Sequence, residues 1–405
     1  MLQKFQKLFQ NPWFIAWLVL PFIKPATEFT GKFDLIFDLL KILHCGIILL
    51  GYRFIQKKPS AMILLIGGLQ AIFLAATCLK GGMIWWGAVQ VLSILSLCAL
   101  LEMTLRLDRK AALQGFGISL GLMGLATVIT MFACYPEGLY TVVTEHEIEG
   151  LWHLPETNNF LWGFDNASAF KFIPAMILFL LNTDPKSKKS KIFTFALLFL
   201  ITAAFIYVRA IMALLGALLI LVYFVVLFQR NQVEKLLSVK TCVIAVCIIA
   251  VLLIGVNKNL PFLQTIADHT EKTASLNHRV KVWGNTIEES LASPLIGHGF
   301  EERMVTAKKL GIDHPHNVFL DVLYRGGLSA CLFYGLMLIL ACKKTFKARK
   351  TLFGNILAIG FLAFLLMAQM DYYNDQYLPF LLFILADHTD LFIFDSKKAL
   401  PFKEA

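Results

Sequence analysis

The segment from residue 192 to residue 228, IFTFALLFLITAAFIYVRAIMALLGALLILVYFVVLF, contains one charged side chain, Arg209. A hydrocarbon layer of about 30 Å is crossed by about 20 apolar residues in a helix, so this segment is long enough to cross a membrane twice. Arg209 falls where the chain would turn between the two crossings. The segment therefore predicts two membrane helices, at 192–208 and 210–229, joined by a turn that carries a cation.

The rest of the chain has the same character. Of its 405 residues, 58% are apolar and 16% charged, and the apolar residues form long runs rather than alternating with polar ones. We therefore predict an all-α integral membrane protein with about 12 transmembrane helices, forming a single polytopic domain over residues 1–405. The other ten apolar runs are 12–24, 33–55, 60–79, 82–105, 112–135, 160–182, 240–256, 317–342, 353–369 and 376–394.

A net charge of +10 is compatible with nucleic-acid binding, but the positions of the charges argue against it. Lysine and arginine gather in alternate loops, and the loop from 136 to 159 contains neither. Because cytoplasmic loops of membrane proteins are enriched in these residues, both termini are predicted to be cytoplasmic. We expect no nucleic-acid partner, and membrane lipids as the surroundings.

The eight cysteines lie in or beside apolar runs, and none forms a C-x-x-C pair. They predict neither a disulfide framework nor a zinc ribbon. The basic and then apolar N-terminus resembles a signal peptide without a small-residue cleavage site, so we interpret it as an uncleaved first helix.

Two segments on the non-cytoplasmic side are too long to be simple connections, and long loops often carry function. The first, 136–159, is acidic, and either a solvated surface or a substrate contact explains its carboxylates. The second is a large periplasmic loop at 257–316 that is expected to carry short helices. Within it, 276–291 is predicted to be a helix with Arg279, Trp283 and Ile287 on one face. That face either lies on the membrane surface or caps a cavity.

The sequence Asp313-His314-Pro315-His316-Asn317 precedes a predicted membrane helix, so its side chains lie where a loop enters the bilayer. Two histidines and one aspartate are a weak metal pattern, and we expect no metal. Imidazole can accept a proton from a hydroxyl near neutral pH, which favours acid–base chemistry. The alternative is a histidine that caps the helix or bonds locally.

Several charged residues fall inside apolar runs. Arg209 is either an arginine at a helix end that reaches toward water or a fixed cation that faces a pyrophosphate. Lys171 either pairs with a carboxylate such as Asp165 or contacts a substrate. Asp38 and Lys41 are three residues apart and are expected to pair, without a function.

The second half of the chain resembles the O-antigen ligase and polymerase superfamily of bacterial envelope glycosyltransferases. Three blocks carry the resemblance: YVRAIMALLGALL at 207–219, HRVKVWGNTIEESLASPLIGHGF at 278–300, and HPHNVFLDVLYRGGLSACLFYG at 314–335. The shared pattern is an arginine, a tryptophan four residues later, a P-L-x-G-x-G turn, and then H-N before a helix with a glycine pair. Arg325 departs from it, because many members have an acidic residue before the glycine pair.

The resemblance implies a type-C glycosyltransferase-like fold and a metal-independent, inverting glycosyltransferase without a cofactor. The implied reaction moves O-antigen from undecaprenyl diphosphate to a sugar hydroxyl of lipid A-core oligosaccharide, at the periplasmic face of the bacterial inner membrane. On this pattern His316 takes the place of the catalytic histidine, and Arg209 and Arg279 those of the diphosphate-binding arginines. The residues expected to support them are His314, Asn317, Trp283 and Lys171.

Three alternatives remain open. An O-antigen polymerase of the same superfamily would use a second carrier-linked glycan as acceptor, and such enzymes commonly have two Arg-rich external loops, whereas the first one here is acidic. A secondary transporter also fits a dozen spans, but it predicts repeat symmetry and several buried charges. A non-catalytic scaffold would leave the three blocks unexplained.

Overall fold

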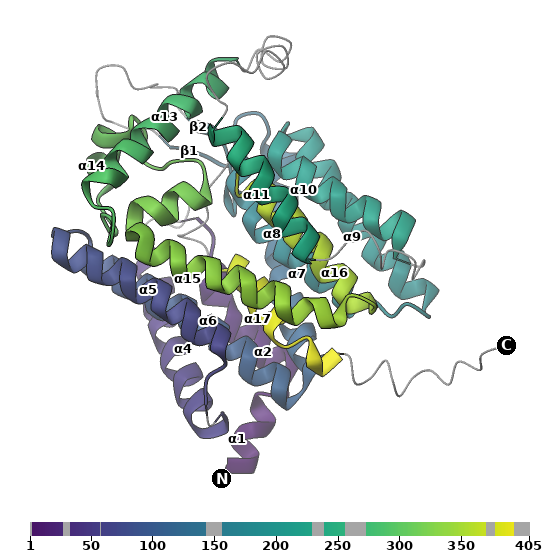
Figure 1. The fold of residues 1–405 in the computed structure, drawn as a ribbon. Helices are drawn as coiled ribbons and strands as arrows, with labels where there is room; N and C mark the ends of the chain where they lie inside the picture. The colour runs from purple at the N-terminus through teal and green to yellow at the C-terminus, as the bar shows by residue number, and fades with distance from the viewer. Residues whose placement is uncertain are drawn as a thin grey trace.

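The computed structural model describes residues 2–26, 33–56, 58–142, 156–228, 239–255, 273–369 and 377–392, which form a bundle of helices (Figure 1). Helices α9, α10, α11 and α16 run beside one another, α5 packs against α15, and α13 and α14 lie across one end of the bundle. In chain order the helices are α1 (Leu2–Leu8), α2 (Pro12–Val19), η1 (Leu20–Ile23), α4 (Asp34–Ile55), α5 (Ala61–Lys80), α6 (Ile84–Leu107), α7 (Arg109–Cys134), α8 (Asp165–Asn182), α9 (Lys188–Tyr207), α10 (Ile211–Val222), η3 (Tyr223–Leu227), α11 (Val239–Gly255), α13 (Thr273–Ala292), α14 (Arg303–Leu310), α15 (Val318–Ala348), α16 (Leu352–Met367) and α17 (Pro379–Asp387).

Six of the described helices are long and apolar enough to cross a membrane: α4, α5, α6, α7, α9 and α15. Five shorter apolar helices accompany them, at Pro12–Ile23, Ser168–Asn182, Ile211–Leu227, Val239–Ile248 and Leu352–Met367. Every predicted apolar run contains at least part of a helix. The chain is therefore a mostly helical, multi-pass membrane protein, and the count of twelve crossings stays a prediction.

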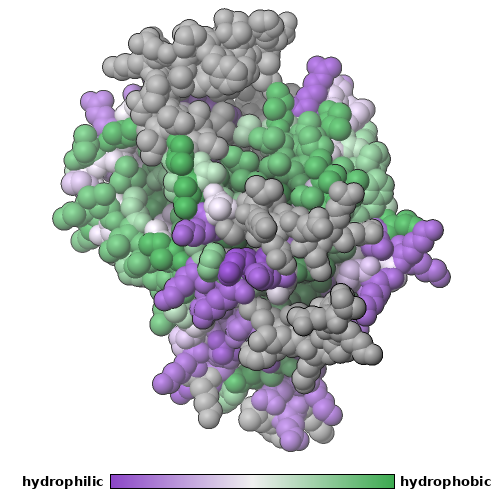
Figure 2. Space-filling model, turned by 45° about the vertical axis from the view of Figure 1, so that its right-hand side comes forward, coloured by the Kyte–Doolittle hydropathy of each residue, from purple (hydrophilic) through white to green (hydrophobic). Residues whose placement is uncertain are grey.

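The surface of the bundle is unlike that of a water-soluble protein. Large apolar side chains are exposed along α4, α7, α9 and α15, including Leu35, Phe193 and Ile339. Figure 2 shows broad hydrophobic areas on one face, with hydrophilic side chains gathered toward its lower half. Because soluble monomers rarely expose contiguous apolar surface of this extent, these faces suit contact with lipid chains.

The expectation of an all-α fold is correct for the bundle but missed a small sheet. Strands β1 (Tyr140–Val142), β2 (Glu156–Phe160) and β3 (Gly163–Phe164) pair antiparallel in the order β1-β2-β3. β1 and most of β2 lie in the segment predicted to be an acidic loop, of which 143–155 fall outside the described residues, whereas β3 lies at the start of the apolar run predicted at 160–182. Strands this short present too few residues for alternation to be recognised.

Helix α15 is interrupted at Gly327, where φ is 61° and ψ is −161°, a conformation open essentially to glycine alone. The break leaves two carbonyls of α15 available to another segment. Tyr324 accepts a hydrogen bond from the N–H of His298 at 2.9 Å, and Arg325 accepts one from Gly299 at 2.8 Å. A buried carbonyl without a donor costs free energy, so this pairing is what makes the break tolerable.

Beyond the break the roles are exchanged, and the N–H groups of α15 donate hydrogen bonds to carbonyls of the other segment. The N–H of Leu328 donates to the carbonyl of Pro294 at 2.8 Å, and that of Ser329 donates to Leu295 at 3.2 Å. A Cβ at Gly327 would lie 2.5 Å from the carbonyl carbon of Leu295. The loop at 293–300, here called the PLIGHGF loop, is thus locked into the broken helix.

The PLIGHGF loop also contacts the first half of the chain. Thr77 of α5 accepts a hydrogen bond from the N–H of Phe300 at 2.8 Å, and the Phe300 carbonyl accepts one from Met83 at 2.8 Å. The Phe300 ring meets Phe73 and Trp86 edge to face. The loop therefore joins α13, α15 and the turn between α5 and α6.

We predict that Gly327→Ala lowers the free energy of unfolding by about 2 kcal/mol or more, because alanine is strained at this φ and its Cβ would meet Leu295. Gly335→Ala in the same helix is the matched control, since a Cβ there meets nothing within 4 Å. The measurement is the apparent Tm in detergent. Equal Tm values for the two variants would contradict this account of the helix break.

Candidate active site

The segment 313–317 links α14 to α15 and contains a chain of hydrogen bonds. Nδ1 of His314 lies 2.6 Å from Oδ1 of Asp313, and Nε2 of His314 lies 3.0 Å from Nδ1 of His316. The two imidazole rings are edge to face, with their centroids 4.0 Å apart. The two predicted histidines are therefore joined to a carboxylate, in what we call the histidine relay.

The carboxylate of the histidine relay is held in its ionised form. Burial alone would raise the pKa of Asp313, but the charge and hydrogen bond of His314 oppose this and outweigh it. The Arg303 guanidinium, 3.8 Å away, and His316 act in the same direction. The pKa of Asp313 therefore lies well below its usual range, and the group carries a negative charge at neutral pH.

The positive charges that lower the pKa of Asp313 belong to the protonated forms of the rings; in the neutral forms, one set of proton positions satisfies both hydrogen bonds. An ionised Asp313 accepts the Nδ1 proton of His314, so the Nε2 of His314 carries a lone pair. His316 then donates from Nδ1 to that lone pair, which leaves the lone pair of His316 on Nε2. This assignment is inferred from the hydrogen bonds. In this arrangement His316 bonds to His314, which bonds in turn to Asp313, an order of groups that resembles the one behind a general base.

Trp283 and Asn317 hold the segment on either side of His316. Trp283 is buried in α13, and its Nε1 donates to the carbonyl of Pro315 at 2.9 Å. Asn317 caps α15, because its Oδ1 accepts hydrogen bonds from the N–H groups of Phe319 and Leu320. Its Nδ2 donates to the carbonyl of Gln369 at 3.1 Å. The helix cap is therefore Asn317 and not a histidine.

His316 and Arg209 share an unusual backbone conformation. Their φ angles are 51° and 57°, and among the described residues they are the non-glycine positions with positive φ. Such residues cost roughly 1–3 kcal/mol and tend to occur at functional sites. The two strained positions are the predicted catalytic histidine and one of the predicted diphosphate-binding arginines.

Arg209 occupies the position at which a helix commonly ends in glycine. The N–H of Ala210 donates to the carbonyl of Phe205, and that of Arg209 donates to Ile206, which is the hydrogen-bond pattern of a Schellman cap. Arg209 takes the left-handed position, and its side chain is exposed. The predicted turn between two membrane helices is present, with the cation at its tip.

Packing relates the Arg209 turn to the histidine relay. A Cβ at Gly216 of α10 would lie 2.8 Å from Sδ of Met367, so α10 meets α16 there at close range. The next residue, Ala368, accepts a hydrogen bond from the N–H of Val318 at 2.8 Å, at the start of α15. Arg209 lies seven residues before Gly216, about 10 Å along a helix. The Arg209 turn and the segment that carries His316 are therefore both connected to the C-terminal end of α16.

Arg279 lies on α13, one turn before Trp283. The predicted helix at 276–291 is confirmed, since α13 spans Thr273–Ala292, and the Arg279 side chain is partly buried. The first part of the predicted 257–316 loop, up to residue 272, lies outside the described residues. Because Trp283 donates to Pro315, the helix face that carries Arg279 contacts the segment 313–317 between the two histidines.

Lys171 belongs to α8 and makes a backbone contact. Its Nζ donates to the carbonyl of Trp162 at 2.7 Å, which connects α8 to the turn between β2 and β3. The side chain of its predicted partner Asp165 is outside the described ones. The predicted pair Asp38 and Lys41 is confirmed at 3.2 Å.

A polar cavity of about 330 Å³ adjoins the histidine relay. Asp313 belongs to its wall, and Arg325, where the sequence departs from the superfamily pattern, pairs there with Asp321 at 2.9 Å. Sequence reasoning missed this cavity, since its residues come from distant segments without a motif. They are Met83, Trp86, Gly299, Glu301, Glu302, Arg303, Thr306, Asp313, Asp321, Tyr324 and Arg325.

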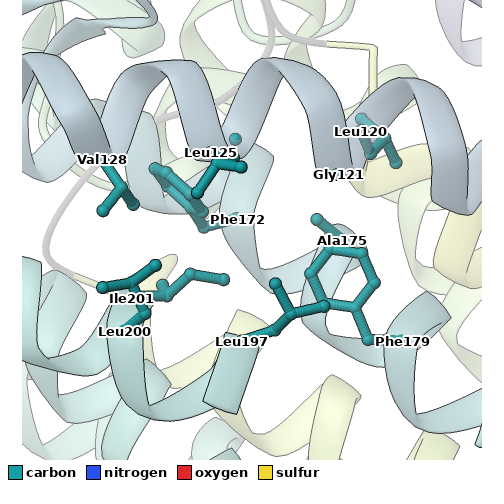
Figure 3. A pocket seen from close by; sticks show the side chains of 11 residues that line it. Leu120, Gly121, Leu125, Val128, Phe172, Ala175, Phe179, Leu197, Leu200 and Ile201 are labelled. Carbon is teal, nitrogen blue, oxygen red and sulfur yellow. The ribbon is translucent and has the colours of Figure 1, made fainter. Parts of the chain in front are cut away.

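A second cavity lies between α7, α8 and α9 (Figure 3). Its wall is apolar throughout and includes Leu125, Phe172 and Leu197. Without a polar group it offers no acid, base or charge to a reaction, so it does not compete with the histidine relay as a chemical site.

Comparison with known proteins finds a match over the part of the chain that contains the histidine relay. Residues 193–335 match the family model described as O-antigen ligase, a range that holds every predicted site residue except Lys171. No curated protein and no solved structure matches the chain. Residues 193–335 are thus similar to the O-antigen ligase family, and this similarity supports membership of the O-antigen ligase and polymerase superfamily.

Proposed function

We propose that this protein is an O-antigen ligase that transfers a glycan from undecaprenyl diphosphate to a sugar hydroxyl of lipid A-core oligosaccharide. The observation that carries the proposal is the histidine relay, which lies within the residues that match the O-antigen ligase family model. We propose that the relay orients His316 as a base. Both substrates keep their lipid chains in the bilayer, so a site where a loop enters a membrane helix suits them. On the positive-inside rule this site faces the periplasm.

The proposed step is one displacement at the anomeric carbon. The acceptor oxygen forms a bond to this carbon while the bond to the diphosphate oxygen breaks, and the diphosphate leaves with the electron pair. The acceptor hydroxyl loses its proton to Nε2 of His316, which later returns it to water. Attack opposite to the leaving group inverts the anomeric configuration. No metal takes part in the proposed step.

Arg209 and Arg279 are proposed to stabilise the leaving diphosphate. Negative charge grows on its oxygen as the bond breaks, and guanidinium groups donate two parallel hydrogen bonds to such an anion. The strained backbone at Arg209 supports this role, since glycine would serve the turn better. The energetic cost of placing arginine there is consistent with a use for its side chain.

The close alternative is a polymerase of the same superfamily, with a carrier-linked glycan as acceptor. We favour the ligase because the loop at 136–159 is acidic and has no arginine.

The two functions differ in the acceptor that the reaction requires. Incubation of purified protein with carrier-linked glycan, in excess chelator, should give product only when lipid A-core is added. Self-extension of the glycan would identify a polymerase, and loss of product that a divalent ion restores would contradict the metal-free step.

His316→Asn should lower the transfer rate by about 10²-fold to 10⁴-fold, since asparagine tolerates positive φ but cannot accept the proton. Asp313→Asn should lower kcat by a smaller factor, with little change in the KM for the donor, because the orientation of the relay is lost while the imidazole of His316 remains. Glu288→Gln is the control, an exposed carboxyl on α13. If His316→Asn turned over at a near-normal rate, the assignment of the base would be wrong.

Arg209→Gly should separate activity from stability. Glycine adopts the φ of 57° without strain, so the apparent Tm should hold or rise, whereas loss of the guanidinium should slow transfer by about tenfold to a hundredfold. Arg209→Lys should also slow transfer, since an ammonium lacks the planar fork. Arg349→Lys is the control, because Arg349 caps the C-terminal end of α15, the end that lies away from His316. Full activity of Arg209→Gly would exclude the proposed role.

A further inference from the structure

We propose that the polar cavity beside the histidine relay is the acceptor site and binds a neutral sugar ring of the acceptor. It lies between the α5–α6 turn, α14 and the first turns of α15, and its volume of about 330 Å³ falls within the range of small-ligand pockets. The inference rests on the proposed function and deepens it, because it names the residues that present the attacking hydroxyl.

The charge of the cavity argues against the donor diphosphate as its occupant. Four carboxylates line it with two guanidinium groups, and Lys309 pairs with one of these carboxylates, so negative charges still outnumber positive ones by one. An anion that entered would meet like charge at short range. Sugar hydroxyls, in contrast, donate hydrogen bonds to carboxylates, which accept and cannot donate when ionised. The carboxylates are Glu301, Glu302, Asp313 and Asp321.

Three of the four carboxylates, those of Glu301, Asp313 and Asp321, are held by the protein, so this part of the cavity is preformed. Glu301 accepts hydrogen bonds from Lys309 at 2.5 Å and from the Tyr324 hydroxyl at 2.6 Å. Asp321 is 1% exposed and is bound by Arg325, whose guanidinium stacks over Phe300. A site whose polar groups are already oriented loses little entropy when it binds a ligand.

An aromatic face completes the cavity. Trp86 belongs to its wall and is 36% exposed, and its ring is braced edge to face by Phe300 with centroids 5.3 Å apart. A braced indole with a free portion of its surface offers an apolar face to the C–H groups of a sugar ring. Carboxylates and an indole together match a ligand that has hydroxyls at its edge and C–H groups on its faces.

Asp313 connects the cavity to the chemistry. The same carboxylate lines the cavity and orients His314, which bonds to His316. A sugar bound here therefore has the histidine relay as its neighbour. The proposed diphosphate-binding arginines lie outside the cavity wall, so donor and acceptor have separate surroundings.

The test compares two adjacent tryptophans. Trp86→Ala should weaken binding of lipid-free core oligosaccharide by about tenfold, whereas Trp85→Ala, a residue 76% exposed and outside the wall, should leave it unchanged. Trp86→Phe keeps an edge contact with Phe300 and should retain most of the affinity. Glu302→Gln should also weaken binding, with Glu288→Gln as its control. Calorimetry on the full-length protein measures each affinity, and the apparent Tm verifies folding.

In turnover, Trp86→Ala should raise KM for the acceptor and leave KM for the donor unchanged, and inorganic pyrophosphate should not displace the core oligosaccharide. Displacement by pyrophosphate, a raised donor KM, or equal effects of the two tryptophan variants would overturn the proposal. Binding that depends on Trp86 without any transfer would instead contradict the proposed function and leave the sugar site standing.

Discussion

The break in α15 at Gly327 is the constraint on which the arrangement of the site depends. A membrane helix cannot leave backbone groups without hydrogen-bond partners, because the hydrocarbon layer supplies none. The PLIGHGF loop supplies them, with hydrogen bonds on both sides of the break. The loop directly follows α13, so the same pairing fixes the end of the helix that carries Trp283. Trp283 in turn holds Pro315, the residue before His316.

The site contains two residues with strained backbone, and each is surrounded by close packing or hydrogen bonds. Positive φ at His316 and Arg209 costs free energy that packing elsewhere must offset. Around His316 the offset comes from Asn317, which caps α15 and bonds to the end of α16. Around Arg209 it comes from the close contact of α10 with α16 through Gly216. In our proposal both strained residues act on the reacting groups, the cation on the diphosphate and the imidazole on the acceptor hydroxyl.

Features that depend on local periodicity could be predicted from the sequence, and those that depend on distant contacts could not. Apolar runs located the membrane helices, and the stretch between 276 and 291, which has a single glycine, located α13. The helix break escaped notice because Gly326-Gly327 inside an apolar run looks like an ordinary part of a membrane helix. The acceptor cavity escaped notice because Trp86 and Glu302 are brought together only when the PLIGHGF loop docks. The helix cap at Arg209 could not be predicted either, because the residue usually found at that position of a helix end is glycine.

The most direct test of the central claim is a structure of the protein in lipid nanodiscs with polyprenyl diphosphate bound. The account predicts that both guanidinium groups, Arg209 and Arg279, lie within hydrogen-bond distance of the diphosphate. It also predicts that Nε2 of His316 faces the position of the anomeric carbon, on the side of the cavity lined by Asp313. A diphosphate bound within that acidic cavity, or away from both arginines, would contradict it.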